Sequence, residues 1–224
     1  MKPDFITKNG RRIPLTGRGG GGGRSAVAAA ALVLGVTGVV GGGVAGGGAA
    51  GSATGGSAGG SSVTARKLDG QKAAKRGDRD GAWQRMGLRK RAERLHRQVE
   101  CLSASHGEVR EFFTHTPCTS LDRMVIAVED DTNTAVISVA WVGFRTTRDL
   151  RAFKRIEDEH GTGDIHPLGA PLLGLADITF TGHNYGTKTT GTTLTIAEVE
   201  PVSGNLDGAT LDALAEVAAY LPRP

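Results

Sequence analysis

The run AVISVAWVGF at residues 135–144 is almost continuously apolar and rich in β-branched side chains. Such a run is typical of a central strand that is buried on both faces of a sheet. The preceding segment, LDRMVIAVE at residues 121–129, has apolar residues on one side of an alternating pattern. Residues 130–133, DDTN, have the composition of a turn between the two segments. The sequence therefore predicts a β-hairpin at the centre of the folded domain.

Apolar side chains recur at the spacing of an α-helix on both sides of this hairpin. Four helices are predicted in this way, over residues 82–102, 105–116, 147–159 and 207–221. The first prediction rests on Leu88, Ala92 and Leu95, which begin a 4-3-4-3 series of apolar residues. The second rests on Ser105 and Glu108, which have the spacing of a capping box.

A second hairpin is predicted from residues 177–185 and 192–200, with a turn around Gly186 and Gly191. The stretch before it, residues 167–175, is interrupted by proline and glycine and has room for one helical turn at most. The expected fold class is α+β, a small antiparallel sheet of two hairpins with helices packed on one face.

Residues 26–50 form an uncharged segment, AVAAAALVLGVTGVVGGGVAGGGAA, before this domain. A membrane-spanning helix needs about 20 mostly apolar residues. The segment is apolar to Val40 and then becomes glycine-rich, and each glycine costs about 1 kcal/mol of helix propensity relative to alanine. Three interpretations stay open: a single-pass helix or signal anchor, a cleaved export signal, and a disordered low-complexity tract. The first is the working prediction.

Composition divides the chain of 224 residues into four parts. These are a basic disordered arm at 1–25, the transmembrane or signal-anchor segment at 26–50, a flexible spacer at 51–81 and the α+β domain at 82–224. The spacer and the segment before it are glycine-rich, because 19 of the 35 glycines lie between Gly17 and Gly60. Glycine has no side chain to pack, so this region is not expected to form a core.

The formal net charge of +4 is distributed unevenly along the chain. Residues 1–25 have six Lys/Arg against one acidic residue, and residues 63–98 have twelve against four. Residues 99–224 have nine against eighteen, a net charge of −9. The folded domain is therefore expected to be acidic, which argues against a basic nucleic-acid-binding domain.

Lys/Arg residues flanking the apolar segment predict its orientation. The 20 residues before the segment contain five basic residues, namely Lys8, Arg11, Arg12, Arg18 and Arg24. The 20 residues after it contain two, Arg66 and Lys67. This bias places the N-terminus in the cytoplasm and the C-terminal domain outside. The basic cluster at 72–91 argues the other way, although distant charges count for less.

The chain has two cysteines, Cys101 and Cys118, and they favour a disulfide if the domain is exported. Closing a loop of this length contributes about 3 kcal/mol to stability in the chain-entropy model. Two free thiols are one alternative. A metal site with His106 and His115 is another, although the spacing C-x4-H-x8-H-x2-C matches none of the usual zinc patterns.

The most polar loop of the domain contains His160, Asp164 and His166, which form a possible polar site. A His and Asp pair could act as acid and base, but a turn that ends a helix explains the local glycines equally well. The chain contains no G-x-S-x-G, H-E-x-x-H or Walker sequence. No catalytic residue, metal site or cofactor is therefore predicted.

The second half of the chain resembles a group of uncharacterised actinobacterial membrane-anchored or exported proteins. The residues that carry the resemblance include Cys101, the run TPCTSLDR at 116–123, SVAWV at 138–142 and GTG at 161–163. The resemblance covers roughly residues 99–222. It implies a glycine- and alanine-rich anchor followed by a small domain with two cysteines, and it implies no activity.

These observations favour a non-enzymatic, membrane-anchored extracytoplasmic domain that binds or senses an unknown ligand. The expected partners are the membrane and an envelope ligand or protein, whereas nucleic acid is not expected. The expected location is the cell membrane, single-pass with the C-terminal domain outside, or outside the cell after signal cleavage. One alternative is a cytoplasmic protein whose basic segment 66–97 binds nucleic acid or anionic lipid. Another is a hydrolase or metal-dependent enzyme, in which the His, Asp and Cys residues above would converge.

Overall fold

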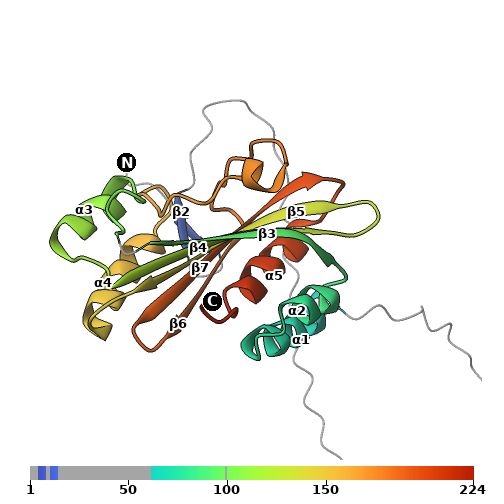
Figure 1. Ribbon diagram of the computed structural model, residues 1–224, viewed down its shortest axis with the longest axis horizontal. Coiled ribbons are helices and arrows are strands. Elements are labelled where there is room, and N and C mark those ends of the chain that lie inside the picture. Colours follow the sequence, from blue (N-terminus) through green and yellow to red (C-terminus); the bar gives the residue numbers. More distant parts are fainter. Residues whose placement is uncertain (1–4, 9–10, 15–61, 99) are drawn as a thin grey trace, which may run out of the picture. The chain divides into compact units, whose positions relative to one another are not determined.

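The computed structural model describes residues 5–8, 11–14, 62–98 and 100–224 (Figure 1). The expected membrane segment at 26–50 lies outside the described residues. Among the residues that are described, no helix is both long and apolar enough to cross a membrane. Within the basic arm, strands β1 (Phe5–Lys8) and β2 (Arg11–Pro14) form an antiparallel pair, in contrast to the disorder predicted there.

A five-stranded antiparallel sheet forms the centre of the domain, with the strand order β3-β4-β5-β7-β6. Its strands are β3 (Arg89–Gln98), β4 (Ser120–Glu129), β5 (Thr134–Gly143), β6 (Tyr185–Thr190) and β7 (Thr193–Ser203). Strand β5 is central and buried at every position, as its continuous apolar sequence predicts. The α+β class, the antiparallel sheet and the β4–β5 hairpin are confirmed.

The turn of this hairpin is organised by Asp130. Its Oδ1 atom accepts the backbone N–H groups of Thr132 and Asn133, each at 2.8 Å, and the Asn133 side-chain amide also donates to its carboxylate. These donors stabilise the charged form, and they lower the pKa of Asp130 to about 2. The DDTN sequence is therefore explained by turn geometry.

Helices cover both faces of the sheet, and the prediction of helices on one face is wrong. They are α1 (Val63–Lys75), α2 (Arg79–Arg85), α3 (Gly107–His115), α4 (Thr147–Glu157), α5 (Gly208–Ala218) and the short 3-10 helix η1 (Ala170–Leu173). On β5, Val139 and Trp141 pack in the cluster that includes residues of α1, α2 and α5, whereas Val142 packs in the cluster of α3 and α4. Neighbouring side chains of a strand point to opposite faces, so a strand buried throughout requires cover on both.

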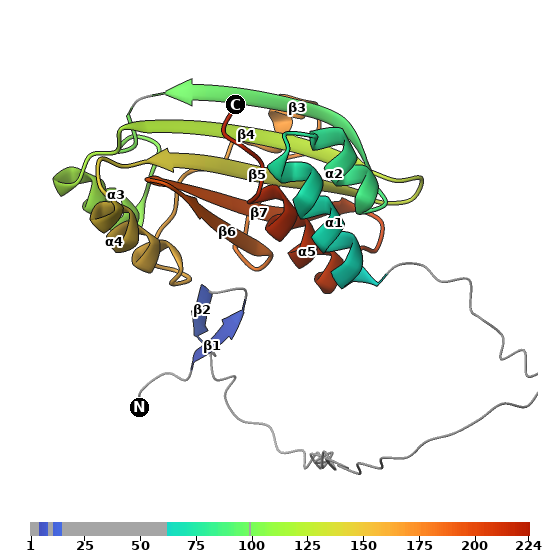
Figure 2. The same cartoon turned by 90° about the horizontal axis from the view of Figure 1, so that it is seen from below.

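The two groups of helices also lie toward different ends of the sheet. Figures 1 and 2 both show α3 and α4 at one end of the strands and α1, α2 and α5 toward the other. We call these the disulfide end and the α5 end. The disulfide end has a cluster of four phenylalanines, Phe112, Phe113, Phe144 and Phe153, with ring centroids 5.1 to 6.3 Å apart.

The helix predicted over residues 82–102 is wrong, because this stretch forms α2 and the edge strand β3. Strand β3 pairs with β4 along its length, with Leu95 opposite Met124. A register shift between Lys90 and Ala92 interrupts the alternation of its side chains, so the apolar residues imitate a helical spacing. Leu95 is 41 % exposed. The predicted helix would instead have buried it along its apolar face.

The flexible spacer predicted at 51–81 is also wrong for its second half, which forms α1. The hydroxyl of Ser62 caps this helix by accepting the Ala65 backbone N–H at 3.2 Å. Its buried residues are small, namely Gly70, Ala73 and Ala74. A Cβ atom on Gly70 would lie 3.0 Å from a methyl group of Val217 in α5. The small residues that suggest a spacer are therefore the surface on which α1 packs.

The basic charge of residues 63–98 consequently belongs to the folded domain. Lys67 of α1 pairs with Glu216 of α5 at 2.7 Å, and Lys90 of β3 pairs with Asp80 of α2 at 3.1 Å. Residues 63–224 together have twenty-one Lys/Arg and twenty-two Asp/Glu, a net charge of −1. The folded part is close to neutral, and the expectation of a strongly acidic domain is corrected.

Helix and strand boundaries differ from the predictions at three further places. Helix α3 begins at Gly107 after His106, and the Ser105 hydroxyl donates to the Leu102 carbonyl instead of capping the helix. Helix α4 is capped by Thr146, whose hydroxyl accepts the Asp149 backbone N–H at 3.1 Å. Strand β6 begins at Tyr185, where the predicted strand ends.

Candidate functional site

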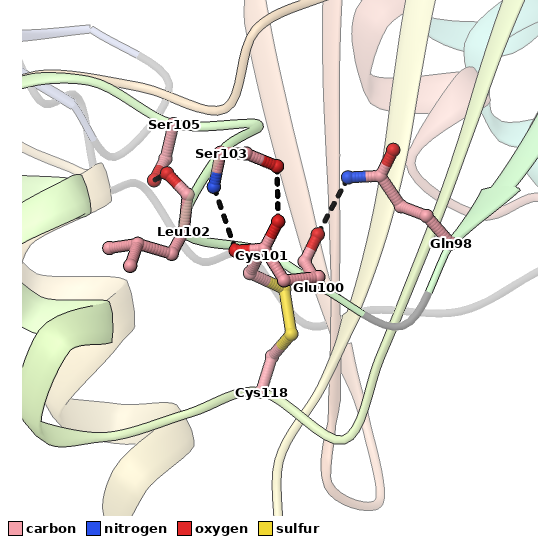
Figure 3. Close-up of a disulfide and its surroundings, with 7 residues drawn as sticks. All are labelled: Gln98, Glu100, Cys101, Leu102, Ser103, Ser105 and Cys118. Carbon is pink, nitrogen blue, oxygen red and sulfur yellow. Dashed lines mark hydrogen bonds between the residues drawn. A yellow bond between two sulfur atoms is a disulfide. The ribbon is translucent and has the colours of Figure 1, made fainter.

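Cys101 and Cys118 form a disulfide, and no cysteine of the chain is free. Their Cα atoms are 6.1 Å apart, within the usual range for a disulfide. Figure 3 shows the bond beside Glu100, whose carboxylate accepts the Ser103 backbone N–H at 2.8 Å. The bond connects the segment that follows β3 with the segment that precedes β4. Since the two sulfur atoms are bonded to each other, neither the free thiols nor the cysteine metal site is formed.

The possible polar site lies in a cleft of about 260 Å³, which we call the histidine cleft. Its lining includes His106, residues 160–164, Thr181 and Glu198. His160 and Asp164 therefore share one cleft. His166 is not among the lining residues, but its ring stacks on that of His106, with centroids 4.8 Å apart. The structure thus gathers the three predicted residues in one region, together with His106, which sequence reasoning considered only as a metal ligand.

Backbone contacts between two distant segments build the wall of this cleft. The Glu108 N–H donates to the Thr162 carbonyl at 2.6 Å, and the His106 N–H donates to the Asp164 carbonyl at 3.1 Å. A Cβ atom on Gly163 would lie 2.3 Å from the His106 carbonyl oxygen, so only glycine fits there. The glycines of this loop therefore allow close packing against the start of α3.

Each histidine near the cleft has a defined neighbour. His160 Nε2 lies 3.0 Å from the Thr181 carbonyl oxygen, and His183 Nδ1 lies 2.9 Å from the Thr181 hydroxyl. The His166 backbone N–H donates to Ala104, at 2.7 Å. Burial lowers the pKa of the His166 side chain, and the nearby charges of His106 and Arg123 lower it further. Both effects favour the neutral form of the His166 ring.

These contacts engage the polar side chains of the histidine cleft with Thr181 and with the backbone. General acid–base catalysis needs a base within hydrogen-bond reach of the proton that it removes. The ring nitrogen of His160 is engaged by a backbone carbonyl, and the Thr181 hydroxyl donates to Glu200. Within the described part of the chain, no group of three or more His, Cys, Asp or Glu side chains is placed to hold a metal ion.

A second cleft, of about 330 Å³, lies on the face of the sheet that α1 and α5 cover, and it was not predicted from the sequence. We call it the lysine–tyrosine cleft. Its lining includes Lys75 of α1, Lys188 of β6, Trp141 of β5 and residues 219–223 after α5. The indole N–H of Trp141 donates to the Leu221 carbonyl at 3.0 Å, which holds the C-terminal tail against the sheet. Trp141 lies in the run 135–144 predicted as a buried central strand, and no local pattern in the sequence relates Lys75 to Lys188.

Comparison with known protein families, with curated proteins and with solved structures found no match to this chain. The features of the described residues that bear on function are the disulfide, the histidine cleft, the lysine–tyrosine cleft and the charge distribution.

Proposed function

We propose that the chain is a membrane-anchored, non-enzymatic protein whose folded domain lies outside the cytoplasm and binds or senses a ligand. The observation that carries this proposal is the disulfide between Cys101 and Cys118. Disulfides persist in oxidising compartments and are rare in the cytosol.

The charge distribution supports the orientation with the domain outside. The Lys/Arg excess before the apolar segment 26–50 favours a cytoplasmic N-terminus. The basic cluster at 72–91, which argues against this orientation, belongs to the folded domain. Domains are translocated largely regardless of their charge. The basic cluster at 72–91 therefore counts little against a domain outside the cytoplasm.

The two clefts support binding as the role of the domain. Ligand pockets usually enclose about 300–1,000 Å³ and combine apolar walls with a few polar groups. The lysine–tyrosine cleft, at about 330 Å³, has this size and this mixture of residues. The histidine cleft is smaller and more polar, and its histidines contact backbone groups and Thr181.

Protease accessibility tests the location directly. A C-terminal tag should be digested in intact cells or spheroplasts without lysis, and mass spectrometry under non-reducing conditions should find Cys101 joined to Cys118. A tag that is protected until lysis, together with reduced cysteines, would refute the extracytoplasmic location. Mature protein that begins after residue 45 would instead show that the export signal is cleaved.

A second candidate function, electrostatic binding to nucleic acid or anionic lipid through residues 66–97, has one observation in its favour. Strand β3 lies at the edge of the sheet, and the side chains of Arg91 and Arg97 are 48 % and 62 % exposed. Both arginines nevertheless form ion pairs, Arg91 with Glu129 at 3.6 Å and Arg97 with Asp122 at 4.0 Å, as do other basic residues of the segment, such as Lys67 with Glu216. This function predicts an affinity for DNA that falls steeply with rising salt. An affinity that does not change with salt would exclude it.

A further inference from the structure

The lysine–tyrosine cleft lies on a row of register partners that crosses the sheet. The row consists of Lys188, Thr195, Trp141, Asp122 and Arg97, one residue from each strand in the order β6, β7, β5, β4 and β3. At one end of the row Asp122 is neutralised by an ion pair with Arg223, and Arg97 lies 4.0 Å away. At the other end, Lys188 has no carboxylate partner among the described residues.

A second unpaired lysine joins Lys188 in the cleft. The ammonium groups of Lys75 and Lys188 lie 4.7 and 4.9 Å from the centroid of the Tyr220 ring, so they are less than about 10 Å apart. Lys75 likewise forms no ion pair with any described residue. The repulsion of two charges at this separation is only partly screened at physiological salt, where the Debye length is about 8 Å. The nearest acidic residue on α5, Glu216, is engaged by Lys67 at 2.7 Å.

The floor of the cleft adds an apolar surface and a free hydroxyl group. Trp141, Ala219 and Pro222 provide the apolar surface. Thr195 is only 4 % exposed, and its hydroxyl has no hydrogen-bond partner within the described ranges. This hydroxyl lines the cleft, so a ligand atom there could form a hydrogen bond with it.

We propose that the lysine–tyrosine cleft binds a small organic dianion, a phosphate monoester with a flat apolar body. A phosphate monoester has a charge of about −1.5 to −2 at pH 7, which matches the two lysines. Its oxygens accept hydrogen bonds from Lys75, Lys188 and the Thr195 hydroxyl, and its apolar body packs against Trp141 and Pro222. This inference rests on the proposed function only in that the domain binds a ligand, and it holds on either side of a membrane.

Calorimetric titration of the detergent-solubilised full chain tests the proposal, with phenyl phosphate as the probe. Phenyl phosphate should bind at millimolar concentration or below and should shift the nuclear magnetic resonance signal of the Trp141 indole N–H. Inorganic phosphate, which lacks the apolar body, and phenol, which lacks the charge, should each bind more weakly. Absence of both heat and shift with phenyl phosphate would overturn the proposal, as would equal binding of phenol.

Substitution of the lysines separates the site from general electrostatic attraction. Lys75→Met and Lys188→Met should each weaken the binding of phenyl phosphate about tenfold, the effect expected for loss of one charge-assisted hydrogen bond. Lys72→Met is the matched control, because Lys72 is on the same helix and its exposed side chain pairs with Asp69 at 3.1 Å. Equal weakening by all three substitutions would show only nonspecific attraction and would overturn the site. These results do not depend on where the tag is digested in cells, so the failure of either proposal can be recognised separately.

Discussion

The α5 end and the disulfide end of the sheet are stabilised in different ways. At the α5 end, seven of the eleven residues of α5 are buried, and the helix packs directly on the backbone of β6. At the disulfide end, α3 buries only Val109 and Phe113 of its nine residues. There the chain depends on the phenylalanine cluster, on backbone hydrogen bonds to the loop at 162–164, and on one covalent bond. Regions with fewer buried apolar contacts open at lower free-energy cost, so the disulfide end should be the less stable of the two.

The largest expected effect is the loss of the phenylalanine cluster. Phe153→Ala removes a side chain that is fully buried at the disulfide end. Such substitutions usually lower the free energy of unfolding by about 3–5 kcal/mol. Urea unfolding followed by circular dichroism measures the change. Leu172→Ala, at a side chain that is 54 % exposed, is the control and should change stability by less than about 0.5 kcal/mol. A loss below about 1 kcal/mol for Phe153→Ala would contradict the importance of this cluster.

Removing the disulfide should have the next largest effect. The double substitution Cys101→Ala and Cys118→Ala opens a loop with a sequence separation of 17 residues, and it should lower the free energy of unfolding by about 3 kcal/mol. Hydrogen exchange should quicken in α3 more than in α5. A reducing agent should destabilise the natural sequence but not the double variant. Equal quickening of exchange in both helices would show that the two ends open together.

At the α5 end, the close approach of α5 to β6 gives a third test. A Cβ atom on Gly186 would lie 2.7 Å from the Ala215 carbonyl oxygen and 2.9 Å from the Glu216 Cα atom. Gly186→Ala should therefore displace α5 and cost about 1–3 kcal/mol of stability. Gly208→Ala is the matched control, because a Cβ atom there meets nothing within 4 Å. If the two substitutions have the same effect, the contact between α5 and β6 is not tight.

The smallest expected effect concerns the pH dependence of stability that arises from His166, beside the histidine cleft. Because the pKa of His166 is lowered in the folded state from about 6.5, protonation favours the unfolded chain. The contribution of neutral His166 to the free energy of unfolding is fully present above the pKa that histidine has in the unfolded chain. This contribution is lost as the pH falls below about 6.5. His166→Gln should therefore flatten the stability profile between pH 7 and pH 5, measured by thermal unfolding. His115→Gln, at an exposed residue of α3, is the control for the loss of a histidine side chain.

Sequence reasoning was most successful where local pattern and tertiary environment agree. The continuous apolar run of β5, the turn at Asp130 and the amphipathic helices α4 and α5 were all predicted close to their observed limits. The disulfide pair was predicted as well. In these elements the spacing of apolar side chains along the sequence matches which side chains are buried in the fold.

The α1–α2–β3 region was not predicted, because its environment is supplied by distant parts of the chain. The buried residues of α1 are glycine and alanine, which give no apolar periodicity in the sequence, and at Gly70 a larger side chain would meet Val217 of α5. Strand β3 is an edge strand whose partner begins at Ser120. The lysine–tyrosine cleft has the same origin, since Lys75 and Lys188 meet only after the sheet and α1 are assembled.

The positions of the two tryptophans have a spectroscopic consequence. Trp83 and Trp141 are both almost completely buried, and both belong to the apolar cluster of the α5 end. The disulfide end contains phenylalanines and Tyr185 but no tryptophan. Intrinsic tryptophan fluorescence therefore reports on one half of the domain, and a partial opening of the other half would leave the emission spectrum almost unchanged.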